Sequence, residues 1–335
     1  MHTLDLKQME ILREFVRKNR KRGVIGFSRR VEDGKIIIYT EDTAQLRKLS
    51  IPEALSGFQI EFREIGKLRA LEGSGGDDEA RAIDRTNFFD PLVAGISIGH
   101  YRITAGTLGW FGVIDGHIVI ISNNHVLAWE NKGKIGDEIL QPGSYDLRRH
   151  GYDPQDPKYV VAHLLWWVPI QFESYTCPFR NLLHTIKKGL RMAKPGANHV
   201  DLAVASIKTK LERELRFEIL GLDGVNGWAL VKVGTQVVKS GRTTGVTRGK
   251  VVDTHYSGYV YYSRGTAWFE DQILVKGEGK PFCQGGDSGS LVLTEANAFA
   301  GLVFAGSGKY GLVNPAKFVL EHLRERGIKM VGVDA

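Results

Sequence analysis

From about residue 91 onward, short runs rich in valine, isoleucine, tyrosine and tryptophan recur between glycines. The runs lie at residues 116–122, 228–233, 234–239, 250–255, 259–262, 290–293 and 301–305. Runs of this kind favour β-strands, and the glycines between them favour tight turns. The chain holds 40 glycines among its 335 residues, enough for a turn residue at each hairpin. The pattern predicts an all-β barrel or sandwich, interrupted by helices near residues 181–192 and 315–326.

The N-terminal part of the chain has a different pattern. Residues 4–21 place apolar side chains on one stripe at helical spacing, which predicts an amphipathic helix. Strands are predicted at residues 23–28, 35–40 and 58–62, with a hairpin turn at Asp33 and Gly34. These elements predict a small α+β domain over residues 1–72.

A linker is predicted at residues 73–90. Residues 72–79 contain only glycine, serine and acidic residues, without any apolar side chain, and this composition is typical of flexible connections. The remaining residues, 91–335, are predicted to form a second and larger domain.

Composition excludes several classes of protein. No stretch of about 18 apolar residues occurs, so we expect no membrane-spanning helix and no membrane partner. Charged residues occur throughout the first 23 positions, where a signal peptide needs an apolar core. Cys177 and Cys283 are too few for a disulfide framework, and we expect two free thiols. These features favour a cytoplasmic protein.

The net charge of +7 is concentrated partly in a basic run at residues 17–22. Such a run can contact nucleic acid or anionic lipid, but it more often forms a solvated face. We favour the second interpretation and do not expect a nucleic-acid partner. The sequence gives no indication of the oligomeric state.

The most informative motif is Gly-Asp-Ser-Gly at residues 286–289. A serine hydroxyl is a poor nucleophile unless a neighbouring base takes its proton. The glycines around Ser288 allow a tight turn in which the amides of Gly286 and Ser288 converge on a developing oxyanion. The motif alone also occurs by chance in glycine-rich loops, so further residues are needed to assign chemistry.

Two other residues supply the missing groups. His125 follows the apolar run at residues 118–121, and Asp201 precedes another at residues 202–205. Taken alone, such a histidine is more often structural and such an acid is more often a turn residue. The order His, Asp, Ser along the chain, however, distinguishes one arrangement of the catalytic triad from two others.

These motifs together resemble those of the chymotrypsin-like serine proteases, in particular the bacterial intracellular members and their plant narrow-leaf-type relatives. His125, Asp201 and Ser288 match the triad positions of that family. Residues 239–249, which include Ser-Gly-Arg-Thr-Thr-Gly, resemble a segment of the α-lytic bacterial branch. The resemblance extends over about residues 91–325.

The resemblance implies a mainly β fold: a double six-stranded β-barrel of chymotrypsin type that follows the small N-terminal α+β domain. The two barrels are expected at roughly residues 91–205 and 206–325. It also implies a serine endopeptidase that acts on a polypeptide substrate through the triad and an acyl-enzyme, with Gly286 and Ser288 as the oxyanion hole. No metal and no organic cofactor are expected.

Two finer expectations follow from the same resemblance. Arg242 is expected to form a buried ion pair with Asp287. This pair would hold open the loop that carries Gly286 and Ser288, which we call the oxyanion loop. Four residues are expected to form the specificity pocket, namely Phe282, Phe304, Ala305 and Gly306. Because no acid stands at residues 280–282, we expect an apolar or small side chain before the scissile bond.

Two alternatives remain open at this point. The protein is either an active protease or a latent one, in which the N-terminal domain or the aromatic insertion between His125 and Asp201 regulates access. A less favoured alternative is a binding protein with a protease fold and a vestigial triad, although the sequence retains every group that the chemistry needs.

Overall fold

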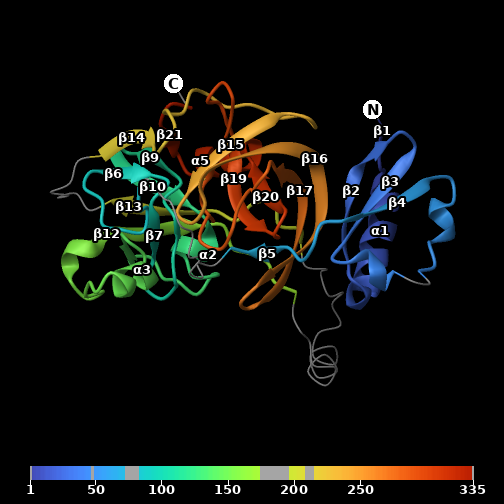
Figure 1. Ribbon diagram of the computed structural model, residues 1–335, viewed down its shortest axis with the longest axis horizontal. Coiled ribbons are helices and arrows are strands. Elements are labelled where there is room, and N and C mark those ends of the chain that lie inside the picture. The colour runs from blue at the N-terminus through green and yellow to red at the C-terminus, as the bar shows by residue number, and fades with distance from the viewer. Residues whose placement is uncertain (1, 47–48, 72–82, 174–195, 208–214, 334–335) are drawn as a thin grey trace, which may run out of the picture.

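The computed structural model describes residues 2–46, 49–71, 83–173, 196–207 and 215–333. It contains two β-barrels and an N-terminal α+β unit that lies beside the second barrel (Figure 1). The mainly β, double-barrel fold of chymotrypsin type expected from the sequence is confirmed. In the described residues, no helix is both long enough and apolar enough to cross a membrane.

The first barrel closes through one bent strand. Its sheet runs in the order β9-β10-β13-β12-β11-β7-β8, and β8 and β9 are consecutive in the chain. The two residues between them keep the ladder intact, because Leu108 N donates to Ile96 O (2.9 Å) and Gly109 N donates to Ile121 O (3.2 Å). The strands are β7 (Ser97–His100), β8 (Gly106–Thr107), β9 (Trp110–Ile114), β10 (His117–Ser122), β11 (Glu138–Leu140), β12 (Val160–Trp167) and β13 (Ala203–Ile207).

The second barrel closes directly, because β15 pairs with both β18 and β16 at the two ends of the order β15-β18-β19-β20-β17-β16. Closure removes the exposed sheet edges that otherwise promote aggregation. The strands are β15 (Gln236–Gly241), β16 (Gly245–Tyr262), β17 (Gly265–Gly277), β18 (Leu291–Thr294), β19 (Phe299–Gly306) and β20 (Tyr310–Pro315).

Some predicted strand boundaries were wrong. The runs at 250–255 and 259–262 belong to one strand, β16, whose pairing with β17 absorbs three register shifts and so needs no break. Residues 228–233 form only an isolated bridge from Trp228 to Phe299. Leu230 in this run is 69% exposed, so its apolar composition does not reflect a buried strand.

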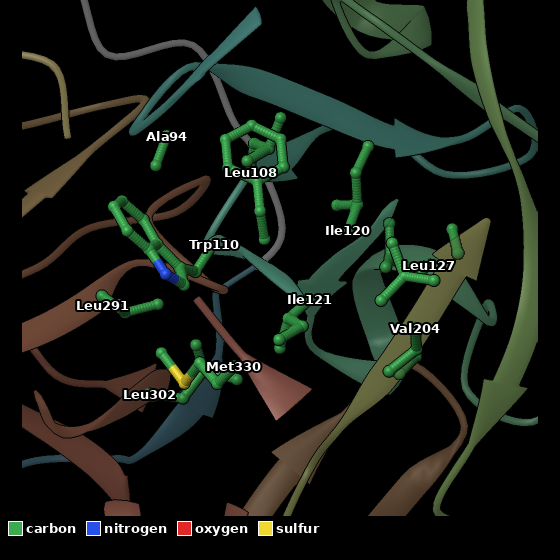
Figure 2. Close-up of a cluster of buried hydrophobic side chains, with 14 of the residues drawn as sticks. Ala94, Leu108, Trp110, Ile120, Ile121, Leu127, Val204, Leu291, Leu302 and Met330 are labelled. Atoms are coloured by element: carbon green, nitrogen blue, oxygen red, sulfur yellow. The ribbon is translucent and has the colours of Figure 1, made fainter. Parts of the chain in front are cut away.

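A single apolar core joins the two barrels. Figure 2 shows Trp110 and Ile121 of the first barrel in the same cluster as Leu291 and Leu302 of the second. All four are at most 1% exposed, and burying each such side chain contributes about 1.5–3 kcal/mol. After the second barrel, α5 (Ala316–Glu325) and β21 (Lys329–Met330) return to the first, where β21 pairs with β9. The helix predicted at 315–326 corresponds to α5.

The N-terminal unit packs one helix on a small sheet. α1 (Leu6–Asn19) begins at a capping box between Asp5 and Gln8 and buries Leu12, Phe15 and Val16 against the sheet. Its strands are β1 (His2–Thr3), β2 (Val24–Glu32), β3 (Lys35–Thr40) and β4 (Gln59–Glu64). Each predicted N-terminal element therefore corresponds to an observed one, within a few residues.

The N-terminal unit shares a sheet with the second barrel. β2 pairs antiparallel with β16, where Phe27 lies opposite Ser257 and Gly26 lies opposite Gly258. Beyond β4 the chain forms β5 (Arg69–Ala70), which pairs with both β16 and β19. The N-terminal sheet is thus continuous with the sheet of the barrel that carries the motif at residues 286–289.

Part of the basic run at residues 17–22 contributes to this docking. The guanidinium of Arg20 lies 4.5 Å from the centre of the Tyr259 ring and 3.3 Å from the carboxylate of Glu173. Arg17 instead pairs with Glu14 on the exposed face of α1, at 3.0 Å. The run is therefore divided between a packing role and a solvated face.

The remaining elements lie around the first barrel. They are α2 (Asn124–Leu127), α3 (Ser144–Arg149) and the parallel pair formed by β6 (Leu92–Ala94) and β14 (Leu215–Ile219). Residues 73–82 of the predicted linker, the helix predicted at 181–192 and Cys177 lie outside the described residues. The end of the predicted linker packs on the barrel, since Arg85 is 8% and Thr86 is 1% exposed.

We predict that Tyr39→Phe weakens the attachment of the N-terminal unit. The Tyr39 hydroxyl donates to the buried carboxylate of Asp253 (2.6 Å) across the junction. Losing a hydrogen bond to a buried charged group is expected to lower the free energy of unfolding by about 1.5–3 kcal/mol. Urea unfolding followed by tryptophan fluorescence measures this change, and a loss below about 0.5 kcal/mol would contradict the assigned contact.

Candidate active site

Three predicted side chains meet between the barrels. His125 lies on α2 at the end of β10, Asp201 precedes β13, and Ser288 lies in the loop before β18. His125 Nδ1 is 2.6 Å from Asp201 Oδ2, and His125 Nε2 is 2.6 Å from Ser288 Oγ. Because a carboxylate only accepts, Nδ1 carries the proton and Nε2 is free to accept from the serine hydroxyl. The first barrel thus supplies the acid and the base, and the second supplies the hydroxyl.

The Asp201 carboxylate is held by groups beyond His125. The hydroxyl of Tyr262 donates to Asp201 Oδ2 at 2.9 Å. The backbone of Asp201 is also fixed, because its N–H donates to Asn314 Oδ1 (3.0 Å) and its carbonyl accepts from Asn123 Nδ2 (2.7 Å). Burial, together with the charge of Asp201, raises the pKa of Tyr262 well above its usual value, so the phenol remains a donor.

The loop that carries Ser288 requires glycine on both sides. Gly286 has φ of +96°, and a Cβ there would lie 2.4 Å from Thr243 Oγ1. Gly289 has φ of +93°, and a Cβ there would lie 2.1 Å from Ser122 Oγ. Both backbone conformation and space therefore exclude any larger residue at these two positions.

The peptide unit between Gly285 and Gly286 has a fixed orientation. Thr243 Oγ1 donates to the carbonyl oxygen of Gly285 at 2.6 Å. In a trans peptide the N–H points away from the carbonyl, so the Gly286 N–H faces the opposite side. There it donates to the carbonyl oxygen of Leu71 at 2.9 Å. One predicted oxyanion donor is thus aimed at a peptide carbonyl.

The predicted ion pair between Arg242 and Asp287 was wrong. Lys239 Nζ lies 3.2 Å from Asp287 Oδ2, and both side chains are fully buried. The side chain of Lys239 extends from β15 towards Asp287, whereas Arg242 follows the end of β15 and extends towards α3. The lysine therefore occupies the position that we expected the arginine to fill.

Asp287 is stabilised as a carboxylate by several donors. Burial alone would raise the pKa of Asp287, but the charge of Lys239 and hydrogen bonds from Gln284 N and Thr244 lower it below its usual value. The backbone amides of Thr243 and Thr244 each donate to Asp287 Oδ1, at 2.8 and 3.0 Å. The acid that precedes Ser288 thus connects the loop to residues 243–244.

Arg242 pairs with Asp146 on α3. Its Nε donates to Asp146 Oδ2 at 2.8 Å, and its Nη2 donates to Asp146 Oδ1. Its Nη1 also donates to Thr243 Oγ1 at 2.9 Å, the hydroxyl that fixes the Gly285 carbonyl. Arg242 therefore contacts the oxyanion loop through Thr243, and at the same time joins the second barrel to the first.

The four residues predicted to form the specificity pocket have different contacts. The carbonyl oxygen of Phe304 is 3.2 Å from Ser288 Oγ, and its ring packs against Phe269. Ala305 and Gly306 pair through their backbone with residues 69–70. Phe282 is buried in the same apolar cluster as Cys283.

Cys283 is a free, buried thiol next to Gly306. A Cβ on Gly306 would lie 2.8 Å from Cys283 Sγ, so glycine is required for the thiol to fit. Burial raises the pKa of Cys283 to about 12, which keeps it neutral. The expectation of a free thiol is therefore met at Cys283, and this side of the site is apolar.

Sequence reasoning missed Lys239, Asp146 and Tyr262. Lys239 offered a signal, because a lysine directly after two valines in a strand that ends in a barrel interior needs a buried anion as its partner. Asp146 and Tyr262 offered none, since both reach the site from distant parts of the chain.

Comparisons with known proteins find one family profile that matches part of the chain, and solved structures that are similar at low sequence identity. The family profile of the Nal1 C-terminal domain matches residues 223–323, a range that includes Ser288 and excludes His125 and Asp201. No curated protein matches the chain. Among solved structures, the chain is similar to Thermobifida fusca protease A, with 16% identity, 73% of this chain and 100% of that chain covered, and a TM-score of 0.45.

Two further solved structures are similar to the same extent. Nocardiopsis protease has 15% identity, with 72% of this chain and 98% of that chain covered and a TM-score of 0.45. Cellulomonas bogoriensis chymotrypsin has 18% identity, with 72% of this chain and 100% of that chain covered and a TM-score of 0.44.

We predict that Lys239→Met strongly destabilises the protein. The substitution keeps the length of the side chain but leaves the carboxylate of Asp287 buried without its cation. Removing one partner of a buried ion pair typically costs about 3–5 kcal/mol. Chemical denaturation measures the loss, with Lys232→Met at an exposed lysine as the control. An equal and small effect of both substitutions would contradict the assignment.

Proposed function

We propose that this protein is a serine endopeptidase that hydrolyses peptide bonds with His125, Asp201 and Ser288 as its catalytic triad. The observation that carries the proposal is the pair of 2.6 Å hydrogen bonds that link Asp201 to His125 and His125 to Ser288. The two bonds lie beside an amide, that of Gly286, which already donates to a peptide carbonyl. A nucleophile, its base, an orienting acid and an oxyanion donor are thus present in one site.

The first half of the reaction forms an acyl-enzyme. His125 Nε2 takes the proton of Ser288 while Oγ adds to the carbonyl carbon of the substrate. The tetrahedral intermediate then collapses, the C–N bond breaks, and the leaving amine takes that proton from His125. The N-terminal half of the substrate is now an ester of Ser288.

The second half of the reaction is hydrolysis of this ester. His125 takes a proton from water, whose oxygen adds to the ester carbonyl. Collapse releases the carboxylic acid product and returns the proton to Ser288 Oγ. Asp201 stabilises the imidazolium in both halves, and the Tyr262 hydroxyl helps to fix the carboxylate that does so.

The oxyanion of both intermediates is expected to bind the amides of Gly286 and Ser288. These donors are most effective when they are oriented before the charge develops. The chain from Asp146 through Arg242 and Thr243 to the Gly285 carbonyl favours such an orientation. Arg242 thus supports the oxyanion loop without contacting Asp287.

Within the chymotrypsin-like class, we place this chain nearest the bacterial intracellular members and the plant narrow-leaf-type relatives, on the motifs described above. The sequence of the block at residues 239–249 supports a particular likeness to the α-lytic branch, although its arginine pairs with Asp146 instead of the Asp287 that this likeness implied. We accordingly expect a cytoplasmic protease, with residues 1–72 as an N-terminal domain.

We predict that Ser288→Ala abolishes most peptide hydrolysis. Removing the nucleophile should lower kcat by a factor of about 10³ or more, because only binding and the oxyanion donors remain. Hydrolysis of a fluorogenic peptide library by the two purified proteins measures the effect. Hydrolysis that persists unchanged in Ser288→Ala would exclude this residue as the nucleophile.

We predict that Thr243→Val lowers kcat and leaves KM nearly unchanged. Thr243 is a positioning residue: without its hydroxyl the Gly285 carbonyl is free to rotate and the Gly286 amide loses its orientation. Loss of one oxyanion donor typically costs a factor of about 10²–10³ in kcat. Thr243→Ser is the control, and it should retain kcat because it keeps the hydroxyl. If Thr243 had a purely structural role, both substitutions would change KM as well as kcat.

A further inference from the structure

A short segment of the N-terminal part of the chain, residues 69–71, lies against β19 and reaches the loop that carries Ser288. Residues 69–70 pair antiparallel with β19, with Arg69 opposite Gly306 and Ala70 opposite Ala305. The next residue continues the ladder, because Leu71 N donates to the carbonyl oxygen of Phe304 at 3.3 Å. The carbonyl oxygen of Leu71 accepts the Gly286 N–H at 2.9 Å.

This segment is held on both sides. Leu68 is fully buried, and its carbonyl oxygen accepts from Tyr261 N of β16 at 3.1 Å. Arg69 also lies opposite Tyr261 in the parallel pairing of β5 with β16. Residues 68–71, which contain β5, therefore lie between β16 and β19 and reach the amide of Gly286.

The side chain of Leu71 fills an apolar site next to Ser288. It is only 7% exposed and belongs to the same buried cluster as Phe282 and Cys283. A Cβ on Gly306 would lie 3.5 Å from Leu71 Cδ2, so the leucine packs directly over that glycine. The neutral Cys283 thiol forms part of the surroundings, which favours an uncharged side chain in this position.

We infer that residues 68–71 are a built-in substrate mimic, with Leu71 in the place of the residue before the scissile bond. The site therefore prefers peptides that carry a leucine-sized apolar side chain at that place, and the strand competes with them. This inference rests on the proposed function. The inference extends the proposed function in two ways. It names the side chain that the enzyme prefers before the scissile bond, and it identifies residues 68–71 as the segment that keeps the enzyme latent.

The attachment of the strand explains why it competes well. β4 ends at Glu64, and the pairing of β2 with β16 holds the N-terminal sheet against the second barrel. The hydroxyl of Ser307, next to β19, donates to the carbonyl oxygen of Ile65. A strand tethered this closely binds at a high effective concentration, so a free peptide must displace it.

The test uses the full-length protein with Leu71→Asp. A carboxylate is strongly disfavoured in this apolar site, so the strand should leave it while the triad stays intact. The reporter is Leu-Arg-Ala-Leu, the sequence of residues 68–71, with a fluorogenic amide at its C-terminus. We expect hydrolysis to rise about tenfold or more over the wild type. Leu6→Asp, at a leucine that is 82% exposed in α1, should leave the rate unchanged.

A fluorophosphonate probe read by intact mass separates this inference from the proposed function. Faster labelling of Ser288 in Leu71→Asp than in the wild type supports both. Equal labelling and equal hydrolysis in the two proteins would overturn the substrate mimic and leave the peptidase standing. Absence of labelling in both proteins, with their fold verified by circular dichroism, would overturn the peptidase and the inference with it.

A second measurement does not depend on how the variant folds. The same reporter with lysine or glutamate in place of its last leucine is offered to the wild-type protein. We expect hydrolysis to fall about tenfold or more, because the apolar site would have to bury a charge. Preferential cleavage after lysine or glutamate would overturn the inferred specificity.

Discussion

A buried ion pair between Arg242 and Asp146 holds the two barrels together where the site is assembled. His125 belongs to the first barrel and Ser288 to the second, so the hydrogen bond of 2.6 Å between them requires the barrels to keep one relative position. A buried guanidinium is costly without a partner, and Asp146 accepts from it at two nitrogens. The pair therefore favours a single arrangement of the barrels, and the apolar core that they share supports the same arrangement.

The same region connects Ser288, the amide of Gly286 and the N-terminal segment at residues 68–71. Asp287 accepts from Lys239 and from the backbone of Thr243, which fixes the loop around Ser288. The Thr243 hydroxyl orients the peptide whose N–H donates to Leu71. The contacts that orient the Gly286 amide thus also bind the chain's own segment, so the proposed activity and the proposed latency depend on one set of interactions.

The sequence predicted the barrels, and it singled out the three side chains that meet between them, because both depend on local patterns: short strands between glycines, and motifs around His125, Asp201 and Ser288. It did not predict which cation meets Asp287, because Lys239 and Arg242 lie three residues apart and only the strand geometry decides between them. Tyr262 and Leu71 were missed for a different reason: each reaches the site through pairings between segments that are distant in the chain. The strand patterns within residues 1–72 likewise could not indicate that the N-terminal unit shares a sheet with the second barrel, because that pairing joins distant segments of the chain.

Trapping of the acyl-enzyme tests the central claim most directly. The full-length protein and Leu71→Asp are mixed with an activated ester of the peptide Leu-Arg-Ala-Leu, quenched in acid before the first turnover is complete, and analysed by intact mass and peptide mapping. The account predicts that at most one peptidyl group attaches to each chain, at Ser288, and that a larger fraction of chains carries it in Leu71→Asp than in the wild type and none in Ser288→Ala. Acylation of Ser288→Ala to the same extent, or no acylation of any of these proteins, would contradict it.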